Sequence, residues 1–113
     1  MTSDRMRRVD EAMREVLSGA ITSDLKDPRV GFVTVTAVKT SQDLRHARVY
    51  VSVMGTPSER QRTLEGLRSA HGFLQGRVAG ELRLKNTPAL DFVVDETVER
   101  ADRITRLLGQ EPQ

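Results

Sequence analysis

The strongest constraint on the fold of this chain is a run in which apolar and polar residues alternate at every position from Ala47 to Val53. Such alternation is typical of a β-strand with one face against a core and the other in solvent. The apolar face would carry Ala47, Val49, Val51 and Val53, and the polar face would carry Arg48, Tyr50 and Ser52. A sheet built around this strand needs cover on one side only, which predicts a two-layer domain.

Two further segments have strand character. Residues 32–39 are rich in β-branched side chains, and the turn residues Thr40 to Asp43 join them to the strand at 45–53, so a hairpin is expected. A short third strand is predicted at 90–94. The long segment before it has a helical pattern, so the third strand should run parallel to the second, with strand order 1-2-3.

Helical patterns fill the remaining segments. An apolar stripe predicts a first helix, which Pro28 would end; its members are Val9, Ala12, Met13, Val16, Leu17, Ala20 and Ile21. Thr56-Pro57-Ser58-Glu59 combines a capping hydroxyl, a proline at the first helical position and a glutamate at the third, which predicts a helix start. Asp95 can cap a last helix, whose stripe is Val98, Ala101, Ile104 and Leu108.

Glycines interrupt the helical pattern between the hairpin and the third strand. Gly72, Gly76 and Gly80 each lower helix propensity, so two helices are predicted at 57–70 and 73–84, joined by a kink at Ala70-His71-Gly72. Glycine would supply the turn at the kink, and Phe73 would anchor the second helix in the core. We therefore expect one α+β domain over residues 1–109, helices on one face of a three-stranded mixed sheet, and a frayed end at 110–113.

Composition narrows the classes of function. The chain has no cysteine, no apolar signal core at its start and no apolar run long enough to cross a membrane, so a cytoplasmic location and no membrane association are expected. Neither His46 nor His71 has further ligands at metal-site spacing, and the sequence has no GxSxG or phosphate-loop motif. We predict no enzyme activity, no cofactor and no metal.

Charge is distributed unevenly along the chain. Residues 31–86 carry nine Lys or Arg against four Asp or Glu, whereas residues 87–113 carry three against six. A basic centre favours a polyanionic partner, although a solvated surface would look the same.

The candidate contacts with RNA are Arg8, Lys39, Arg45, His71, Arg77, Arg83 and Lys85. His71 could equally pack at the helix junction. Arg29 could touch RNA, but a role in organising the turn before the first strand is favoured. The few aromatic residues are expected mostly in the core, which favours recognition of backbone and shape.

Several short motifs, in order, resemble those of the ribosome-binding factor A family. They are Arg5-x-x-Arg8-Val9, Lys26-Asp27-Pro28-Arg29-Val30-Gly31, Asp43-Leu44 followed by Val49-Tyr50-Val51, Gly72-Phe73, and Leu82-Arg83-Leu84-Lys85 followed by Pro88-x-Leu90-x-Phe92. The order of elements is that of a type II KH domain, an RNA-binding fold that normally joins its central helices through a GxxG loop. An Ala-x-Gly kink in place of GxxG distinguishes this family.

The resemblance implies a monomeric, non-catalytic assembly factor that binds the free 30S subunit and its 16S rRNA. Such a factor assists late maturation, including processing of the 5′-terminal region, and matters most in the cold. Other assembly factors, such as a GTPase, could be partners. Two alternatives remain open: a general KH-like RNA-binding module without a ribosomal role, and a protein–protein adaptor that uses the acidic last helix.

Overall fold

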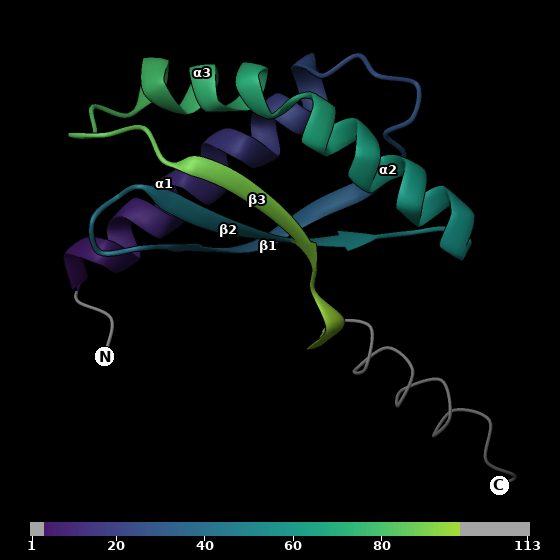
Figure 1. The fold of residues 1–113 in the computed structure, drawn as a ribbon, viewed down its shortest axis with the longest axis horizontal. Coiled ribbons are helices and arrows are strands. Elements are labelled where there is room, and N and C mark those ends of the chain that lie inside the picture. Colours follow the sequence, from purple (N-terminus) through teal and green to yellow (C-terminus); the bar gives the residue numbers. More distant parts are fainter. Residues whose placement is uncertain (1–3, 98–113) are drawn as a thin grey trace, which may run out of the picture.

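The computed structural model describes residues 4–97, and Figure 1 shows their arrangement. Helix α1 (Asp4–Gly19) continues into one π-helical turn, η1 (Ala20–Asp24). Strands β1 (Val33–Thr40) and β2 (His46–Val53) form a hairpin. Helices α2 (Pro57–Ser69) and α3 (His71–Glu81) then lead to β3 (Ala89–Val94). The predicted order of elements is confirmed up to β3, whereas the helix predicted after Asp95 falls largely outside the described residues.

The sheet has the predicted topology. Its strand order is β1-β2-β3, with β1 antiparallel to β2 and β2 parallel to β3. The register between β1 and β2 shifts once, between Val35 and Ala37, where a bulge increases the local twist. All three helices cover the same face of the sheet (Figure 1). The α+β class and the KH type II-like arrangement are therefore confirmed.

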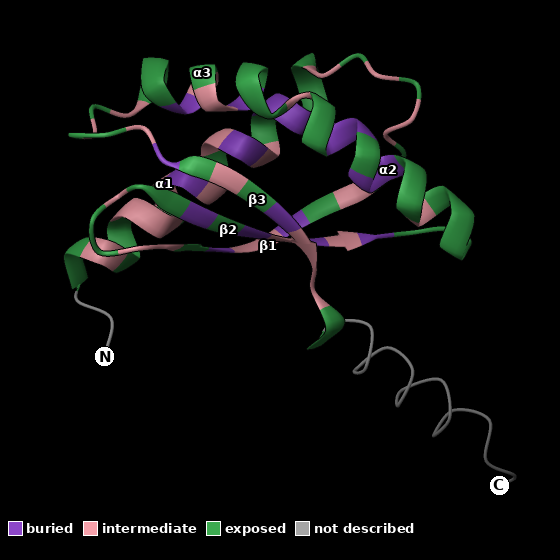
Figure 2. Ribbon diagram, viewed as in Figure 1, coloured by how far each residue is buried: buried purple, intermediate pink, exposed green. Residues whose placement is uncertain are grey.

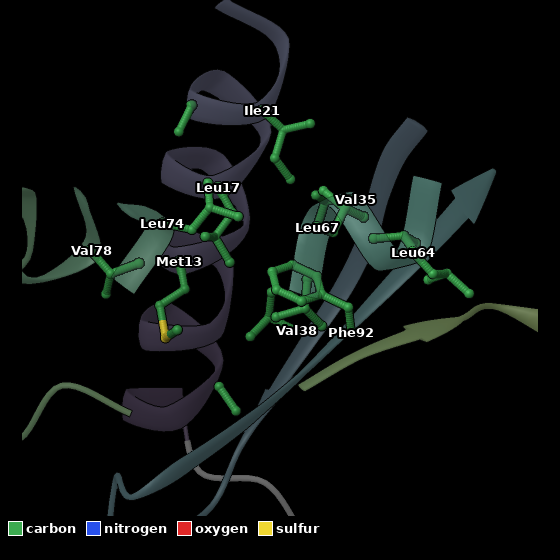
Figure 3. Packing of buried hydrophobic residues seen from close by; sticks show 14 of the residues in the cluster. Met13, Leu17, Ile21, Val35, Val38, Leu64, Leu67, Leu74, Val78 and Phe92 are labelled. Carbon is green, nitrogen blue, oxygen red and sulfur yellow. The ribbon is translucent and has the colours of Figure 1, made fainter. Parts of the chain in front are cut away.

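A single apolar cluster fills the space between the sheet and the helices. The inner face of β2 is completely covered, since Ala47, Val49 and Val51 have no exposed surface. Figure 2 shows this burial along the strand, and Figure 3 shows the side chains that meet it. They come from every helix and from both neighbouring strands, and the largest are Met13, Leu17, Leu67, Leu74, Val78 and Phe92. The alternation in the sequence thus identified the buried face of the sheet.

Several local predictions need correction. The first helical region ends at Asp24, four residues before Pro28, so the proline is not what terminates it. Helix α3 ends at Glu81 and not at residue 84, so Arg83 lies beyond the helix that was predicted to include it, and Lys85 lies further along the same connection. Phe73 is 45% exposed, and Leu74 anchors α3 in the core instead. Phe32 is 83% exposed, so the expectation that most aromatic residues are buried is wrong as well.

The break between α2 and α3 lies at Ala70, and Gly72 is not what makes it. Ala70 has φ −89° and ψ 9°, a conformation open to ordinary residues. Gly72 lies within α3, and a Cβ atom added there would meet nothing within 4 Å. The expectation that glycine supplies the turn is therefore corrected: a side chain at position 72 has room.

Gly66 is a glycine that the packing does require. A Cβ atom at this position in α2 would lie 2.7 Å from Cγ2 of Val30 and 3.3 Å from Cβ of Arg29. The absence of a side chain lets the segment before β1 lie directly against α2. This close approach fixes the position of residues 27–31.

We expect Gly66→Ala to be less stable than the matched variant Gly76→Ala by about 1–3 kcal/mol, the usual cost of overpacking. Gly76 is also interior to a helix, but a Cβ there meets nothing within 4 Å, so alanine should stabilise by about 1 kcal/mol through helix propensity. Chemical denaturation of both variants measures the difference. Equal stabilities would show that the segment before β1 can shift to accommodate the added methyl group at little energetic cost.

Candidate nucleic-acid interface

Three segments that are distant in sequence meet at one end of the molecule. They are the start of α1, the turn between β1 and β2, and the connection between α3 and β3, all at the left of Figure 1. Together they line a hollow of about 690 Å³ that we call the basic groove. Its lining residues are Arg5, Met6, Val9, Gln42, Asp43, Leu44, Arg45, Arg83, Leu84, Lys85 and Asn86. Four are cationic and one is acidic.

The connection between α3 and β3 presents two of these cations. Leu82 and Leu84 are partly buried against the core, and because side chains alternate along an extended chain, Arg83 and Lys85 are exposed. The amide of Gln75 on α3 donates to the carbonyl oxygens of Thr87 and Pro88, at 3.3 and 3.1 Å. These bonds tie the connection to α3 and hold the two cations in place.

The turn between β1 and β2 presents the third cation, Arg45. One carboxylate oxygen of Asp43 accepts hydrogen bonds from the Ser41 hydroxyl at 2.6 Å and the Arg45 amide at 3.1 Å. These bonds hold the pKa of the Asp43 carboxyl below its ordinary value. Leu44 has φ 59°, a left-handed conformation that is uncommon for a residue other than glycine. The acidic residue of the groove therefore shapes the turn, and its other carboxylate oxygen lies 4.0 Å from Nε of Arg45, a long ion pair between two exposed side chains.

A backbone hydrogen bond joins the turn to the connection. The amide of Ala89 donates to the carbonyl of Arg45 at 2.8 Å, at the point where β3 begins to pair with β2. Helix α1 is fixed to the same end, because the carboxylate of Asp10 accepts from the amide of Thr40 at 2.9 Å. Arg5, exposed on the first turn of α1, thereby lines the groove.

The structure brings Arg45, Arg83 and Lys85 together and leaves the other predicted contacts elsewhere. Arg8 is exposed on α1 but does not line the groove. Lys39 lies on the open face of the sheet, in a hollow of about 420 Å³ that it shares with His46, Arg48 and Asp91. The set of candidates therefore does not form one surface.

Two further candidates have partners within the protein. His71 lies exposed at the start of α3, with Nδ1 2.9 Å from the carbonyl oxygen of Arg68. Arg77 forms a short ion pair with Asp24 of η1 and lies 3.8 Å from the carboxylate of Glu81. The charge of Arg77 is thus matched, and this residue fastens α3 to η1.

Sequence reasoning missed Arg5 as a member of the groove. The residue stood in the Arg5-x-x-Arg8 motif, but the motif alone does not say which of the two arginines turns toward the hairpin. The hydrogen bond between Asp10 and Thr40 docks α1 on the hairpin and so determines that Arg5 lines the groove. These two residues are far apart in the sequence. Neighbouring basic residues in the motif were the available signal.

The chain was compared with known proteins. The family model for ribosome-binding factor A matches residues 5–108. The chain belongs to the ribosome-binding factor A family. A member from Anaeromyxobacter sp. (strain Fw109-5) is 54% identical, with 96% of this chain and 90% of that protein covered. The crystal structure of ribosome-binding factor A from Thermus thermophilus has a TM-score of 0.71 at 27% identity, covering 79% of this chain and 94% of that one.

A third match concerns a complex. A homology model of the Thermus thermophilus ribosome binding factor A, fitted into a cryo-EM map of a complex with the 30S subunit, matches at a TM-score of 0.63 and 28% identity. The match covers 77% of this chain and 91% of that one. The family resemblance inferred from the short motifs is therefore confirmed.

At this site the described residues provide positive charge and a concave surface. Among residues 4–97, no three His, Asp or Glu side chains cluster as metal ligands would. No helix in the same range combines the length and the hydropathy that a bilayer span requires. What the basic groove provides is four cations around a concave surface, an arrangement suited to the phosphates of a nucleic acid.

We expect Gln75→Leu to lower the free energy of unfolding by about 1–2 kcal/mol, because two carbonyl groups lose their donor. The matched control is Gln61→Leu on the exposed side of α2, where little change is expected. Thermal unfolding of the two variants measures the effect, which should shift Tm by roughly 4–8 °C per kcal/mol in a domain of this size. Similar Tm values would mean that the bonds from Gln75 contribute little.

Proposed function

We propose that this chain binds the small ribosomal subunit during its maturation, and that the basic groove contacts phosphates of the 16S rRNA. Family membership supports the role, and the complex reported for the Thermus thermophilus relative names the 30S subunit as the partner. The observation that carries the contact is the convergence of Arg5, Arg45, Arg83 and Lys85 around one hollow. This proposal places the protein in the cytoplasm, where ribosomes assemble.

The mechanism is one of binding without bond-breaking. Members of this family are non-catalytic assembly factors, in agreement with the prediction that the chain is not an enzyme. A protein that binds one RNA conformation more tightly than another shifts the folding equilibrium by the difference in affinity. We propose that the chain assists maturation of the 5′-terminal region of the 16S rRNA in this way.

The arrangement of the groove suits a phosphate backbone. Its four cations come from three segments, each fixed by hydrogen bonds or core contacts, so little ordering is needed on binding. Contact with phosphates releases condensed counterions, so binding should weaken steeply with salt. Arg77 is left out of the proposed contact, since Asp24 and Glu81 already match its charge.

The two alternatives have less support. A general RNA-binding module would not need to match the family over residues 5–108. The adaptor hypothesis depended on the acidic last helix, which lies largely outside the described residues. Partners beyond the subunit, such as a GTPase, and the monomeric state stay predictions of the resemblance.

We expect the double variant Arg83→Gln/Lys85→Gln to bind isolated small subunits roughly tenfold more weakly at low salt, because two charge-assisted contacts are lost. The plot of log affinity against log salt should also become shallower by about 1 to 2 units of slope. Co-sedimentation at several salt concentrations measures both quantities.

The matched control is Arg7→Gln/Arg14→Gln, which removes the same charge from α1 at positions outside the groove. It should leave both the affinity and the slope close to those of the wild type. An equal loss in the two double variants would mean that net charge, and not the groove, drives binding.

A further inference from the structure

The end of the molecule opposite the basic groove carries an exposed aromatic side chain. Phe32 is 83% exposed immediately before β1, and Met54 is 73% exposed immediately after β2. The amide of Met54 donates to the carbonyl of Phe32 at 3.1 Å, so the two residues extend the antiparallel ladder as neighbours. Together they line a hollow of about 340 Å³ that also includes Arg29, Arg62 and Thr63. We call this hollow the Phe32 pocket.

The segment that presents Phe32 is held firmly. The carboxylate of Asp27 accepts three bonds from Arg29, from the amide at 2.9 Å, from Nε at 3.1 Å and from Nη2 at 2.8 Å. These bonds lower the pKa of Asp27 to about 2, so the carboxylate is ionised and the pair is present at neutral pH. The interpretation that Arg29 organises this turn is therefore confirmed.

A second set of contacts fixes the same segment to α2. The buried hydroxyl of Thr63 accepts from the Gly31 amide at 3.2 Å and can donate to the Arg29 carbonyl at 3.3 Å. The segment also packs directly on Gly66. Phe32 is consequently held in solvent by a rigid support, and a rigid exposed ring loses little entropy when it binds a partner.

The surroundings of Phe32 favour a nucleotide over a protein surface. Only three apolar side chains line the pocket, those of Pro28, Phe32 and Met54, whereas each partner of a stable protein interface buries roughly 800 Å². Arg62 is exposed and lines the same pocket, whereas the charge of Arg29 is matched by Asp27 and the carboxylate of Glu59 is engaged by the cap of α2. An exposed ring with an arginine in the same pocket can stack on an unpaired base and contact its phosphate.

We propose that the Phe32 pocket binds one unpaired nucleotide of RNA, with the base stacked on the Phe32 ring beside Met54 and the phosphate near Arg62. The inference rests on the proposed function, since it assumes that RNA is the partner. It goes beyond that function by assigning a base contact at a surface separate from the basic groove, where only phosphates are contacted.

Co-sedimentation with isolated small subunits tests the stacking. Leucine keeps position 32 apolar but removes the ring, so we expect Phe32→Leu to bind roughly 5- to 50-fold more weakly, with an unchanged salt slope. Phe32→Trp keeps a ring and should bind at least as tightly as the wild type. Both variants should unfold at the wild-type temperature, because Phe32 is exposed. Binding of Phe32→Leu equal to the wild type would overturn the proposal.

A fluorescence measurement separates RNA from protein as the occupant. The chain has no tryptophan, so Phe32→Trp introduces a single indole. We expect short single-stranded oligouridylate to quench its emission, and the same oligomer paired with oligoadenylate to quench it much less. Weak subunit binding by Phe32→Leu without any quenching would point to a ribosomal protein and would overturn the nucleotide assignment. If the wild type itself failed to sediment with subunits, the proposed function would fall, and quenching alone would still decide the stacking.

Discussion

The structure depends on burial of the inner face of β2. Ala47, Val49 and Val51 are fully covered, and the strand that carries them pairs antiparallel with β1 on one side and parallel with β3 on the other. Parallel pairing requires the chain to cross over the sheet and return to the end at which β2 began. That end is the turn between β1 and β2. This topology places the connection that carries Arg83 and Lys85 beside Arg45. The basic groove is therefore a consequence of the strand order that buries the core.

The same strands separate two surfaces with different chemistry. The basic groove lies at the turn between β1 and β2, whereas Phe32 and Met54 lie at the opposite end of the hairpin. Strands of eight residues span about 26 Å at 3.3 Å per residue. Phosphate contacts supply affinity and orientation without regard to sequence, whereas stacking on an aromatic ring requires an unpaired base. A rigid sheet with one kind of contact at each end can hold two parts of an RNA at a fixed separation.

The sequence predicted those features that arise from local pattern. Alternation identified the buried face of β2, and the capping box at Thr56 and Glu59 is present with both of its hydrogen bonds. What it did not predict depends on contacts between distant residues. The pairing of Arg77 with Asp24 joins positions 53 residues apart and removes an arginine from the proposed contacts. The aromatic residues were expected mostly in the core, and the anchoring of residues 27–31 on α2 explains why the ring of Phe32 stays in solvent.

The lengths of the helical segment and of the sheet explain the break at Ala70. Residues Pro57–Glu81 would span about 37 Å as one straight helix, at 1.5 Å per residue, but β3, the strand that both helices contact, has 6 residues and spans only about 20 Å. A straight helix would carry its end past the sheet and leave Leu74 and Val78 without the core that now buries them. Ending α2 at Ser69 and starting α3 at His71 lets both helices keep contact with the sheet. The need to bury Leu67 and Leu74 against one sheet therefore requires a break between them, and any residue that accepts the conformation of Ala70 can provide it.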